Sequence, residues 1–433
     1  MRRIFPDWTY GPGPRDGCWW DETVAAPDWP ILGEETRADV VIIGGGFTGM
    51  SAALHLAAQG TKVALLEAET PGWGASGRNG GFCCLGGAKL GTAAMERQYG
   101  AAATAAYHKA EVEAVALAGS LIETHRIDAD THSKGETRLA HSPRAMEALR
   151  REAEAGGTLH EASDLPGLGL AGAFYGGLTD PTGFALNPSK YLFGLARSAQ
   201  NFGAALFQRS PALSIRRDGK GWHVSTPTGG VTADAVLICT NGYSSEDVPP
   251  WMASRYMPAQ STVMVTRPMS AGELEAQGWT SDQMAYDTRN MLHYFRLMPD
   301  RRFLFGMRGG LTSSPRAEAS IRRRVRRDFD RMFPAWRGIE TTHSWSGMVC
   351  LSRRLVPFVG PVPKQPGLFA GFAYHGNGVA MGTYSGRALA WLALGQEPGL
   401  PDVMSCLARR FPFGRWRRAI MPPAYAALAL ADL

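Results

Sequence analysis

The chain has 433 residues, 45% of them hydrophobic and 19% charged, which is more than one hydrophobic core usually holds. We therefore expect two connected domains and exclude disorder as the main state. The formal charge of +6 is a weak bias for a chain of this length, so no nucleic-acid partner is expected. Glycine is abundant, with 52 residues, and its clusters indicate places where the backbone closely approaches another group.

Cysteine usage and hydropathy narrow the cellular setting. The six cysteines form no Cys-x-x-Cys pair, which argues against a zinc site or a disulfide scaffold, and no metal is expected. No window reaches the about 18 apolar residues of a membrane-spanning helix, and residues 1–14 lack the apolar centre of a secretory signal. A cytoplasmic protein is expected, while its oligomeric state is left open.

The N-terminal third begins with an irregular segment and continues with a regular one. Residues 1–36 are rich in Pro, Gly and Trp and are expected to form an arm that packs over the surface through its aromatic side chains. A βαβ unit follows, with a buried strand at 40–43, a glycine turn, an Ala/Leu helix ending near Gly60 and a second buried strand at 62–66.

In the middle of the chain the predicted secondary structure changes from a parallel α/β pattern to antiparallel strands. Apolar spacing predicts helices over 100–126, 144–155 and 188–202. Short strands are predicted near 204–208, 213–217, 222–225 and 235–239. Residues 257–312 then alternate or run apolar with aromatic and β-branched side chains, which indicates antiparallel strands. The arginine-rich segment 321–331 carries apolar residues at i, i+4 and i+8, which predicts a helix with a solvated charged face.

The parallel pattern returns near the end of the chain. A strand is predicted at 368–373, followed by a glycine turn and a helix over 379–394. The tail, 401–433, is rich in Arg, Pro and aromatics with short helical potential. We expect it to dock on the body of the protein rather than on a lipid surface.

The turn after the first buried strand has the G-x-G-x-x-G pattern of a dinucleotide site. Gly44 permits the tight turn, Gly46 lets the backbone approach a pyrophosphate, and Gly49 lets the helix pack on its strand. Glu67 ends the next strand, where a carboxylate can accept hydrogen bonds from ribose hydroxyls. The pyrophosphate would then lie at the positive end of the helix dipole.

Three later turns favour FAD over NAD. The segment 72–82, GWGASGRNGGF, is a run of small residues with two polar side chains, next to the ribose-binding strand, and leaves room for a flat ring. The clusters 239–242 and 375–378 each follow a buried strand, and the second opens a helix whose N-terminus can stabilise negative charge on a reduced flavin.

These motifs together carry a family resemblance. GGGFTG with Glu67, the specific segment GASGRNGG and the late GNG turn resemble the D-amino-acid-oxidase-like (DAO) superfamily of FAD-dependent oxidoreductases, and within it the gamma-glutamylputrescine oxidoreductase branch. The resemblance extends in order from about residue 15 to residue 400. It implies an α/β Rossmann-like FAD domain of the glutathione-reductase and DAO type, interleaved with an α+β substrate domain on a largely antiparallel sheet.

The resemblance also implies a division of the chain and a set of cofactor contacts. After the arm, the FAD domain would comprise 37–95, 188–256 and 345–400, and the substrate domain 96–187 and 257–344, ahead of the tail 401–433. The residues expected to contact FAD are Gly44, Gly46, Phe47, Thr48, Gly49, Glu67, Ala68, Gly74, Ala75, Ser76, Arg78, Asn79, Gly80, Gly81, Ala212, Thr240, Asn241, Gly242, Gly376, Asn377, Gly378 and Val379.

The implied chemistry is oxidation of a C–N bond in an amine or amino acid to an imine, which water hydrolyses to a carbonyl compound. His375 and Tyr294 are the candidate catalytic residues. Tyr294 and His293 are neighbours on a strand, so only one of them can face the cavity, and the resemblance favours Tyr294. Arg296 or Arg308 would clamp a carboxylate, and Trp345 is a candidate for binding the substrate amine.

Several points stay open at this stage. Substrates considered are gamma-glutamylputrescine-like amines and N-substituted, sarcosine-like glycines, and a second class of protein is a tRNA-associated flavoprotein. Oxygen or an electron carrier would accept the electrons. Cys350 lies near the position of a flavin-linked cysteine in monomeric sarcosine oxidases, although a buried core cysteine is the default. Those oxidases activate oxygen with a lysine, and none occurs between Lys220 and Lys364.

Overall fold

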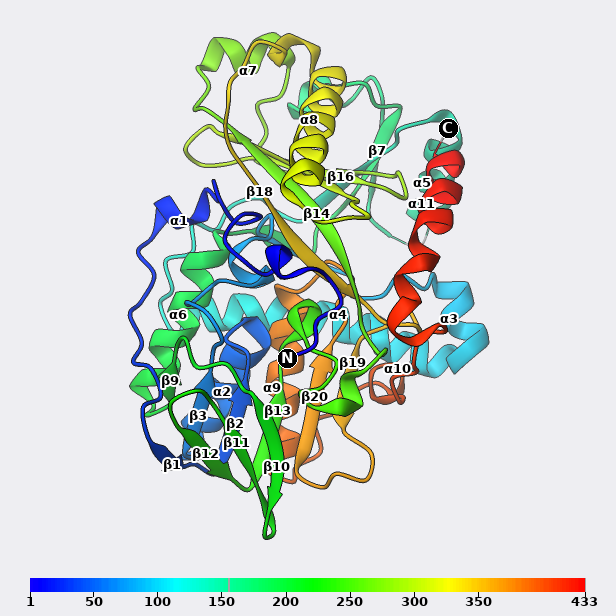
Figure 1. Ribbon diagram of the computed structural model, residues 1–433. Helices are drawn as coiled ribbons and strands as arrows, with labels where there is room; N and C mark the ends of the chain where they lie inside the picture. The colour runs from blue at the N-terminus through cyan, green and yellow to red at the C-terminus, as the bar shows by residue number, and fades with distance from the viewer. Residues whose placement is uncertain (155, 433) are drawn as a thin grey trace.

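The structure is a computed structural model that describes residues 1–154 and 156–432. Two sheets dominate it, a parallel one in the lower half of Figure 1 and an antiparallel one in the upper half. Strands from segments far apart in the sequence meet in each sheet, so the two halves are interleaved along the chain as expected.

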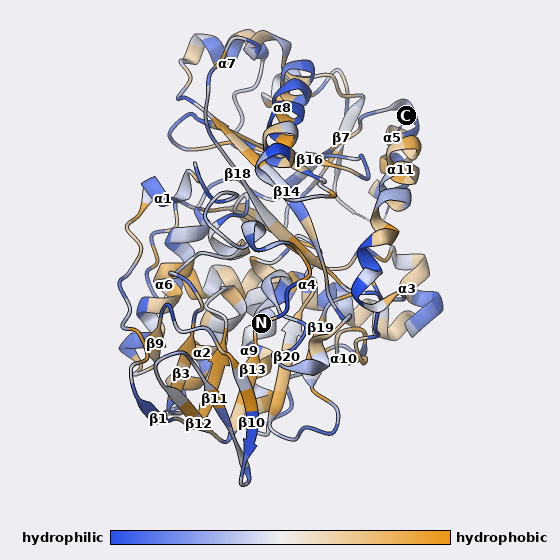
Figure 2. Cartoon of the chain, viewed as in Figure 1, coloured by the Kyte–Doolittle hydropathy of each residue, from blue (hydrophilic) through white to orange (hydrophobic). Residues whose placement is uncertain are grey.

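The lower sheet has six strands. Their spatial order is β19 (Phe358–Pro361), β20 (Leu368–Phe372), β13 (Ala235–Ile238), β2 (Val40–Ile43), β3 (Val63–Leu66) and β9 (Ala205–Phe207). All neighbouring pairs are parallel except β19–β20. The central strands are continuous apolar runs, orange in Figure 2, because both faces of the sheet are covered.

Helices cover one face of this sheet and a small sheet covers the other. The helices are α2 (Phe47–Ala58), α4 (Ala101–Thr124), α6 (Pro188–Asn201) and α9 (Ala380–Ala393), with α2 packed against α6 and α9. The small sheet has the order β1 (Glu35–Arg37), β12 (Gly230–Ala233), β11 (Gly221–Ser225) and β10 (Ser214–Asp218). Accordingly Val40 and Ile42 pack with the helices, whereas Val41 and Ile43 pack with the small sheet.

The upper sheet has eight strands. Their order is β18 (Thr341–Leu351), β14 (Met257–Thr266), β17 (Phe303–Arg308), β16 (His293–Leu297), β15 (Met284–Asp287), β5 (Glu136–Leu139), β7 (Gly176–Asp180) and β6 (Thr158–Glu161). Every neighbouring pair is antiparallel except β15–β5. The expected α/β domain with a largely antiparallel second sheet is therefore confirmed.

The two faces of the upper sheet differ in chemistry. Phe295, Phe303 and Phe305 lie on one face, where they pack beneath α8 (Pro315–Met332) with its residue Phe329. The opposite face carries polar side chains such as Ser261, Tyr294 and Arg308 together with apolar ones such as Val263 and Leu304, because successive residues of a strand point to opposite sides. This alternation separates the aromatic core from a cavity of mixed polarity.

Helix α8 confirms the amphipathic prediction and shows what its arginines do. Arg322 pairs with Glu318, Arg324 with Asp328 and Arg326 with Asp330, all four residues apart along the helix. Figure 2 shows α8 as hydrophilic outside and hydrophobic where it meets the sheet. The arginine run is thus largely matched by acidic side chains of the same helix.

The expected division of the chain is not followed by every element. Helix α4, assigned to the substrate domain from the sequence, packs against α9 and shares the core of the parallel sheet. Strand β18 extends across the expected boundary at 345. The domain limits themselves stay a prediction.

Further elements connect these layers. They are α1 (Trp20–Thr23), β4 (Phe82–Cys84), α3 (Thr92–Tyr99), α5 (Pro143–Ala153), β8 (Gly183–Ala185), α7 (Ala271–Gln277), α10 (Asp402–Ser405) and α11 (Met421–Ala431). Ala155, the expected end of the helix over 144–155, and Leu433, the last residue of the tail, lie outside the described residues. Nowhere in 1–154 or 156–432 is a helix both long and apolar enough to cross a membrane.

The two ends of the chain pack on the body. Trp20 of the arm is buried against Trp345, as the aromatic content of the arm predicted. In the tail, Arg417 is fully buried, where its Nη2 lies 2.7 Å from a Glu246 carboxylate oxygen and its Nε donates to the Tyr256 carbonyl. The tail is docked on the protein, and α11 runs up beside the antiparallel sheet (Figure 1).

Candidate cofactor and substrate site

Two cavities meet between the sheets. The first, of about 180 Å³, lies along the carboxyl ends of β2, β3 and β13, and the second, of about 260 Å³, lies beneath the antiparallel sheet. Both are lined by Ala75, Asn79, Met348, Val349 and Gly376. An extended cofactor in the first cavity would therefore present its far end to the second.

The glycine turn after β2 has the geometry of a dinucleotide cradle. Gly44 has a φ of +106°, and a Cβ there would lie 2.7 Å from the Cys239 carbonyl oxygen on β13. A Cβ on Gly49 would collide with the Gly44 carbonyl, so this glycine allows α2 to pack on the turn as predicted. Helix α2 begins at Phe47 and directs its N-terminus into the cavity.

Glu67 is held in place by two backbone groups. Its Oε2 accepts a hydrogen bond of 2.8 Å from the Gly45 amide and its Oε1 one of 3.0 Å from the Glu69 amide. Burial raises the pKa of this carboxyl, while the two amide donors act in the opposite direction. The carboxylate lines the first cavity at the end of β3, where a ribose would lie.

The loop after β3 carries a buried cation at the junction of the cavities. Arg78 is 2% exposed, with its Nε donating to the Trp73 carbonyl at 2.7 Å and its Nη1 to the Ser346 carbonyl at 3.1 Å. Its Nη2 has no partner among the described residues. Asn79 instead braces the loop, since its side chain bonds the backbone of residues 75, 76 and 81. An unpaired buried donor beside glycine cradles fits a bound flavin.

Most residues predicted to contact FAD line one of the two cavities. Three do not: Gly49, Gly81 and Gly242 lie behind the walls and provide close packing. The sequence missed part of the first cavity, because Arg3 and Tyr10 of the N-terminal arm also line it. The aromatic content of the arm predicted that it would pack, but no motif indicated where.

His375 lines the first cavity, where it was expected. Its Nδ1 donates to the Gly87 carbonyl at 2.7 Å and its Nε2 accepts from the Ser352 amide at 3.1 Å. Burial lowers the pKa of this imidazole to about 3. These contacts suit a neutral ring that fixes the 375–378 loop, and the catalytic role of His375 stays a prediction.

Two further predictions about substrate binding are corrected. The Arg296 guanidinium is buried and donates to the carbonyls of Gly80 and Leu186 and to His132. Trp345 is also fully buried, and its indole nitrogen donates to the Arg78 carbonyl at 2.7 Å. Neither side chain lines either of these two cavities, and both instead bond the backbone of the loop over 78–81.

Tyr294 and Arg308 do line the second cavity. The hydroxyl of Tyr294 lies 3.1 Å from Ser261 Oγ, and its ring lies over Gly306, where any Cβ would collide with it. The Arg308 guanidinium lies against Gly376, one of the residues shared by the two cavities. Burial lowers the pKa of Arg308, yet no described side chain forms an ion pair or hydrogen bond with it.

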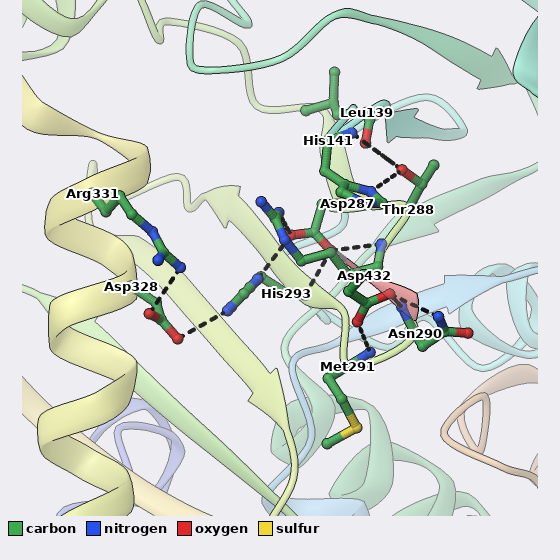
Figure 3. Close-up of polar contacts among 11 residues, drawn as sticks. Leu139, His141, Asp287, Thr288, Asn290, Met291, His293, Asp328, Arg331 and Asp432 are labelled. Carbon is green, nitrogen blue, oxygen red and sulfur yellow. Dashed lines mark hydrogen bonds and ion pairs between the residues drawn. The ribbon is translucent and has the colours of Figure 1, made fainter. Parts of the chain in front are cut away.

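His293 points away from the cavity, as strand alternation predicted. Figure 3 shows it between Asp287 and Asp328. Its Nδ1 lies 2.8 Å from Asp287 and its Nε2 3.5 Å from Asp328 of α8. The two carboxylates raise the pKa of His293 against the opposing effect of burial. This network ties β16 to α8 behind the wall that carries Tyr294.

Several residues that line the second cavity were not predicted from the sequence. Lys89, Glu136, Cys84 and Tyr286 line the second cavity, although none belongs to a motif. The absence of lysine between Lys220 and Lys364 does not leave the second cavity without one, because Lys89 from an earlier segment lines it. The signal for Glu136 and Tyr286 is the pairing of β5 with β15, which a single sequence does not display.

Cys350 lines the first cavity, and burial raises the pKa of its thiol to about 12. A thiol held protonated is a poor nucleophile, which favours the core role over a covalent flavin link. Within the described part of the chain no three His, Cys, Asp or Glu side chains gather in a way that could hold a metal ion.

The parallel sheet, the glycine cradle and the paired cavities define a dinucleotide-binding oxidoreductase, and comparison with known proteins places it more narrowly. The family profile described as FAD dependent oxidoreductase, DAO, matches residues 39–392. The chain is 32% identical to the probable oxidoreductase OrdL of Rhizobium meliloti over 96% of this chain and 97% of that one. It is 28% identical to gamma-glutamylputrescine oxidoreductase of Escherichia coli over 92% and 94% of the two chains.

Solved structures share the fold. Glycine oxidase from Geobacillus kaustophilus superposes with a TM-score of 0.70 at 21% identity, covering 83% of this chain and 95% of that one. Iminodiacetate oxidase from Chelativorans gives 0.69 at 19% identity, covering 84% and 98%. The chain belongs to the DAO family of FAD-dependent oxidoreductases, and it is an enzyme that uses FAD and acts on amines or amino acids.

Proposed function

We propose that the protein oxidises the C–N bond of a small amine or amino acid that carries a carboxylate. The imine formed is hydrolysed to a carbonyl compound, and the electrons pass to oxygen or to an electron carrier. The observation that supports this most directly is Arg308, a partly buried guanidinium in the second cavity that no described acidic side chain neutralises. Such a group favours an anionic ligand, and its planar fork matches a carboxylate.

The chain itself orients the substrate and excludes water. FAD, when bound, supplies the acceptor for the hydride equivalent. Arg308 would hold the carboxylate beside the Gly376 turn. The Tyr294 ring, seated on Gly306, lies against Gly80 of the segment 72–82 and closes that part of the cavity wall. Both gamma-glutamylputrescine-like amines and N-substituted glycines carry a carboxylate, so both belong to this proposal. Six free thiols, five of them buried, support a reducing, cytoplasmic setting.

The proposal is tested on the oxidised holoenzyme without air. Amines with and without a carboxylate are mixed with it anaerobically, and flavin absorbance is followed. We expect at least one carboxylate-bearing amine to bleach the flavin within seconds. Air is then admitted and hydrogen peroxide measured, which separates oxygen from a carrier as the acceptor. Failure of every amine to reduce a fully loaded flavin would rule the proposal out.

Replacing Arg308 with methionine should affect substrates with a carboxylate more than amines without one. We expect kcat/KM for a carboxylate-bearing substrate to fall about 30-fold or more, because the carboxylate loses the cation that lines the cavity. The matching amine without the carboxylate should be oxidised at an unchanged rate. Arg151→Met, which removes an exposed arginine on α5, is the control. Equal losses for both substrates would show that Arg308 supports the fold and not the carboxylate.

A further inference from the structure

The second cavity holds a carboxylate as well as a guanidinium. Glu136 begins β5, is 7% exposed and lines the cavity beside the Cys84 thiol. The nearest cation on its own strand, Arg138, is bound to Glu152, with Nη1 and Oε2 2.5 Å apart. Glu136 itself has no ion pair with any residue of 1–154 or 156–432. Lys89 lines the same cavity and acts on Glu136 at longer range, where it lowers the pKa of the carboxyl. A buried carboxylate that faces a cavity and has no ion-pair partner is a site for a cationic ligand.

Strand register places Glu136 and Arg308 on the same face of the sheet. Glu136 is opposite Met284, two residues before Tyr286, and Tyr286 is opposite Tyr294. Tyr294 is in turn opposite Gly306, two residues before Arg308. Three strand intervals separate β5 from β17. The two strand axes are therefore roughly 14 Å apart, at about 4.8 Å for each interval.

This separation decides what can contact both groups. In an α-amino acid the nitrogen and the carboxyl carbon are only about 2.5 Å apart, as their bond lengths require. The backbones of Arg308 and Glu136 are much further apart than this. A ligand whose positive group lies several carbon atoms away from its carboxylate therefore suits the two groups better than one α-amino acid unit.

The chemistry of the reaction decides which amino group Glu136 can hold. The nitrogen whose C–N bond is oxidised must be neutral, because its lone pair stabilises the forming imine. A neighbouring carboxylate favours the ammonium form of an amine and would therefore oppose the reaction. Glu136 is thus suited to an ammonium group that is not oxidised.

We propose that the enzyme selects a monocarboxylate with two amino groups, one beside the carboxylate on Arg308, which is oxidised, and a distal ammonium group held by Glu136. Amino acids with a side chain or N-substituent that ends in an amine have this arrangement. The inference rests on the proposed function, which it narrows to a class of substrate.

Matched amines test the inference in the holoenzyme under anaerobic conditions. Lysine has both charges, norleucine lacks the distal amine, and 1,5-diaminopentane lacks the carboxylate. Each amino acid is offered as both enantiomers and with a free or N-methylated α-amine. The readout is the ratio of flavin reduction rate to apparent dissociation constant. We expect the best lysine form to exceed the matching norleucine form by about 10- to 100-fold, the range for a hydrogen bond to a charged group.

Glu136→Gln should abolish this preference selectively. We expect the advantage of lysine forms over norleucine forms to disappear, so that the ratio between the two falls to about one. Glu136→Asp should restore part of the preference. Glu147→Gln, which removes an exposed carboxylate on α5 outside the cavity, is the matched control and should leave the ratio unchanged. Flavin content and thermal midpoints confirm that the variants are folded.

The preference should also depend on pH. Burial raises the pKa of Glu136 to about 7, and the groups around it are Cys84, Lys89, Arg138, Asp180 and Tyr286. The carboxylate is the form that binds a cation, so preference for lysine should increase as pH rises through about 7. Lys89 titrates in the same range, since burial lowers its pKa to about 7, but Glu136→Gln removes only the dependence due to Glu136.

The outcomes distinguish this inference from the proposed function. If no amine reduces the flavin, the proposed function fails and the inference fails with it. If norleucine and lysine forms react equally in the unmodified enzyme, the inference alone is wrong. If Glu136→Gln lowers both by the same factor, Glu136 is a structural residue and the inference is also overturned.

Discussion

Alanine in place of Gly44 should produce a folded protein that binds FAD about 5- to 150-fold more weakly. A Cβ at this position would lie 2.7 Å from the Cys239 carbonyl and 3.3 Å from the Thr240 amide, both backbone atoms of the neighbouring turn. Relieving such overpacking costs about 1–3 kcal/mol and would separate the two strand ends that line the cofactor cavity. Fluorescence titration of the FAD-free protein with FAD measures the change.

Gly60→Ala is a matched control for this substitution. Gly60 also has a positive φ, +77°, but a Cβ there meets no atom within 4 Å. Both variants therefore carry the backbone strain of alanine in a left-handed conformation, and only one carries the clash. Equal FAD affinity in the two variants would contradict the assignment of Gly44 to the cofactor turn.

His293→Leu is expected to lower the free energy of unfolding by about 3–5 kcal/mol, the range for removing one partner of a buried ion pair. The substitution would leave two carboxylates without their shared imidazolium, Asp287 with a fully buried side chain and Asp328 with a side chain 5% exposed. Urea unfolding measures the loss. His223→Leu breaks an exposed His–Glu pair and should cost about 1 kcal/mol or less.

The cost of His293→Leu should vary with pH in a defined direction. The pKa of His293 is raised above its usual 6.5, so its stabilising effect is complete below 6.5 and disappears as pH rises through the raised value. The pKa values of Asp287 and Asp328 are lowered from 3.8, so their contribution is present above 3.8 and disappears as pH falls through the lowered values. The difference in stability should be largest between 3.8 and 6.5. A difference independent of pH would show that the loss comes from packing alone.

The cofactor cavity could be predicted because its signals are local. Gly44, Gly49 and Glu67 lie within one βαβ unit, so their spacing along the chain already fixes their places in space. The glycine turns at 239–242 and 375–378 end parallel strands of one sheet, and parallel strands place their carboxyl ends along one edge. The motif spacing and the parallel strand order thus both place the cofactor cavity at the same edge of the sheet.

The substrate cavity could be predicted only in part, because its residues come from distant strands. Tyr294, Arg296 and Arg308 share a face of the sheet. Which arginine reaches the cavity depends on where the segment 72–82 crosses β16, because its residue Gly80 accepts a hydrogen bond from Arg296. Glu136 faces the cavity only because β5 pairs with β15, a strand about 150 residues later in the chain. His375 was placed correctly on its turn, but the two backbone groups that occupy its nitrogens lie in distant segments.

The two unlike faces of the antiparallel sheet also bear on how such an enzyme can diversify. Residues that line the second cavity, such as Tyr286 and Arg308, alternate along their strands with residues of the aromatic core that packs beneath α8. Exchange of a cavity side chain therefore leaves the aromatic core on the other face intact. A lineage with this sheet can acquire a new substrate through single substitutions at little expense in folding, which fits a fold shared by oxidases of glycine and of iminodiacetate.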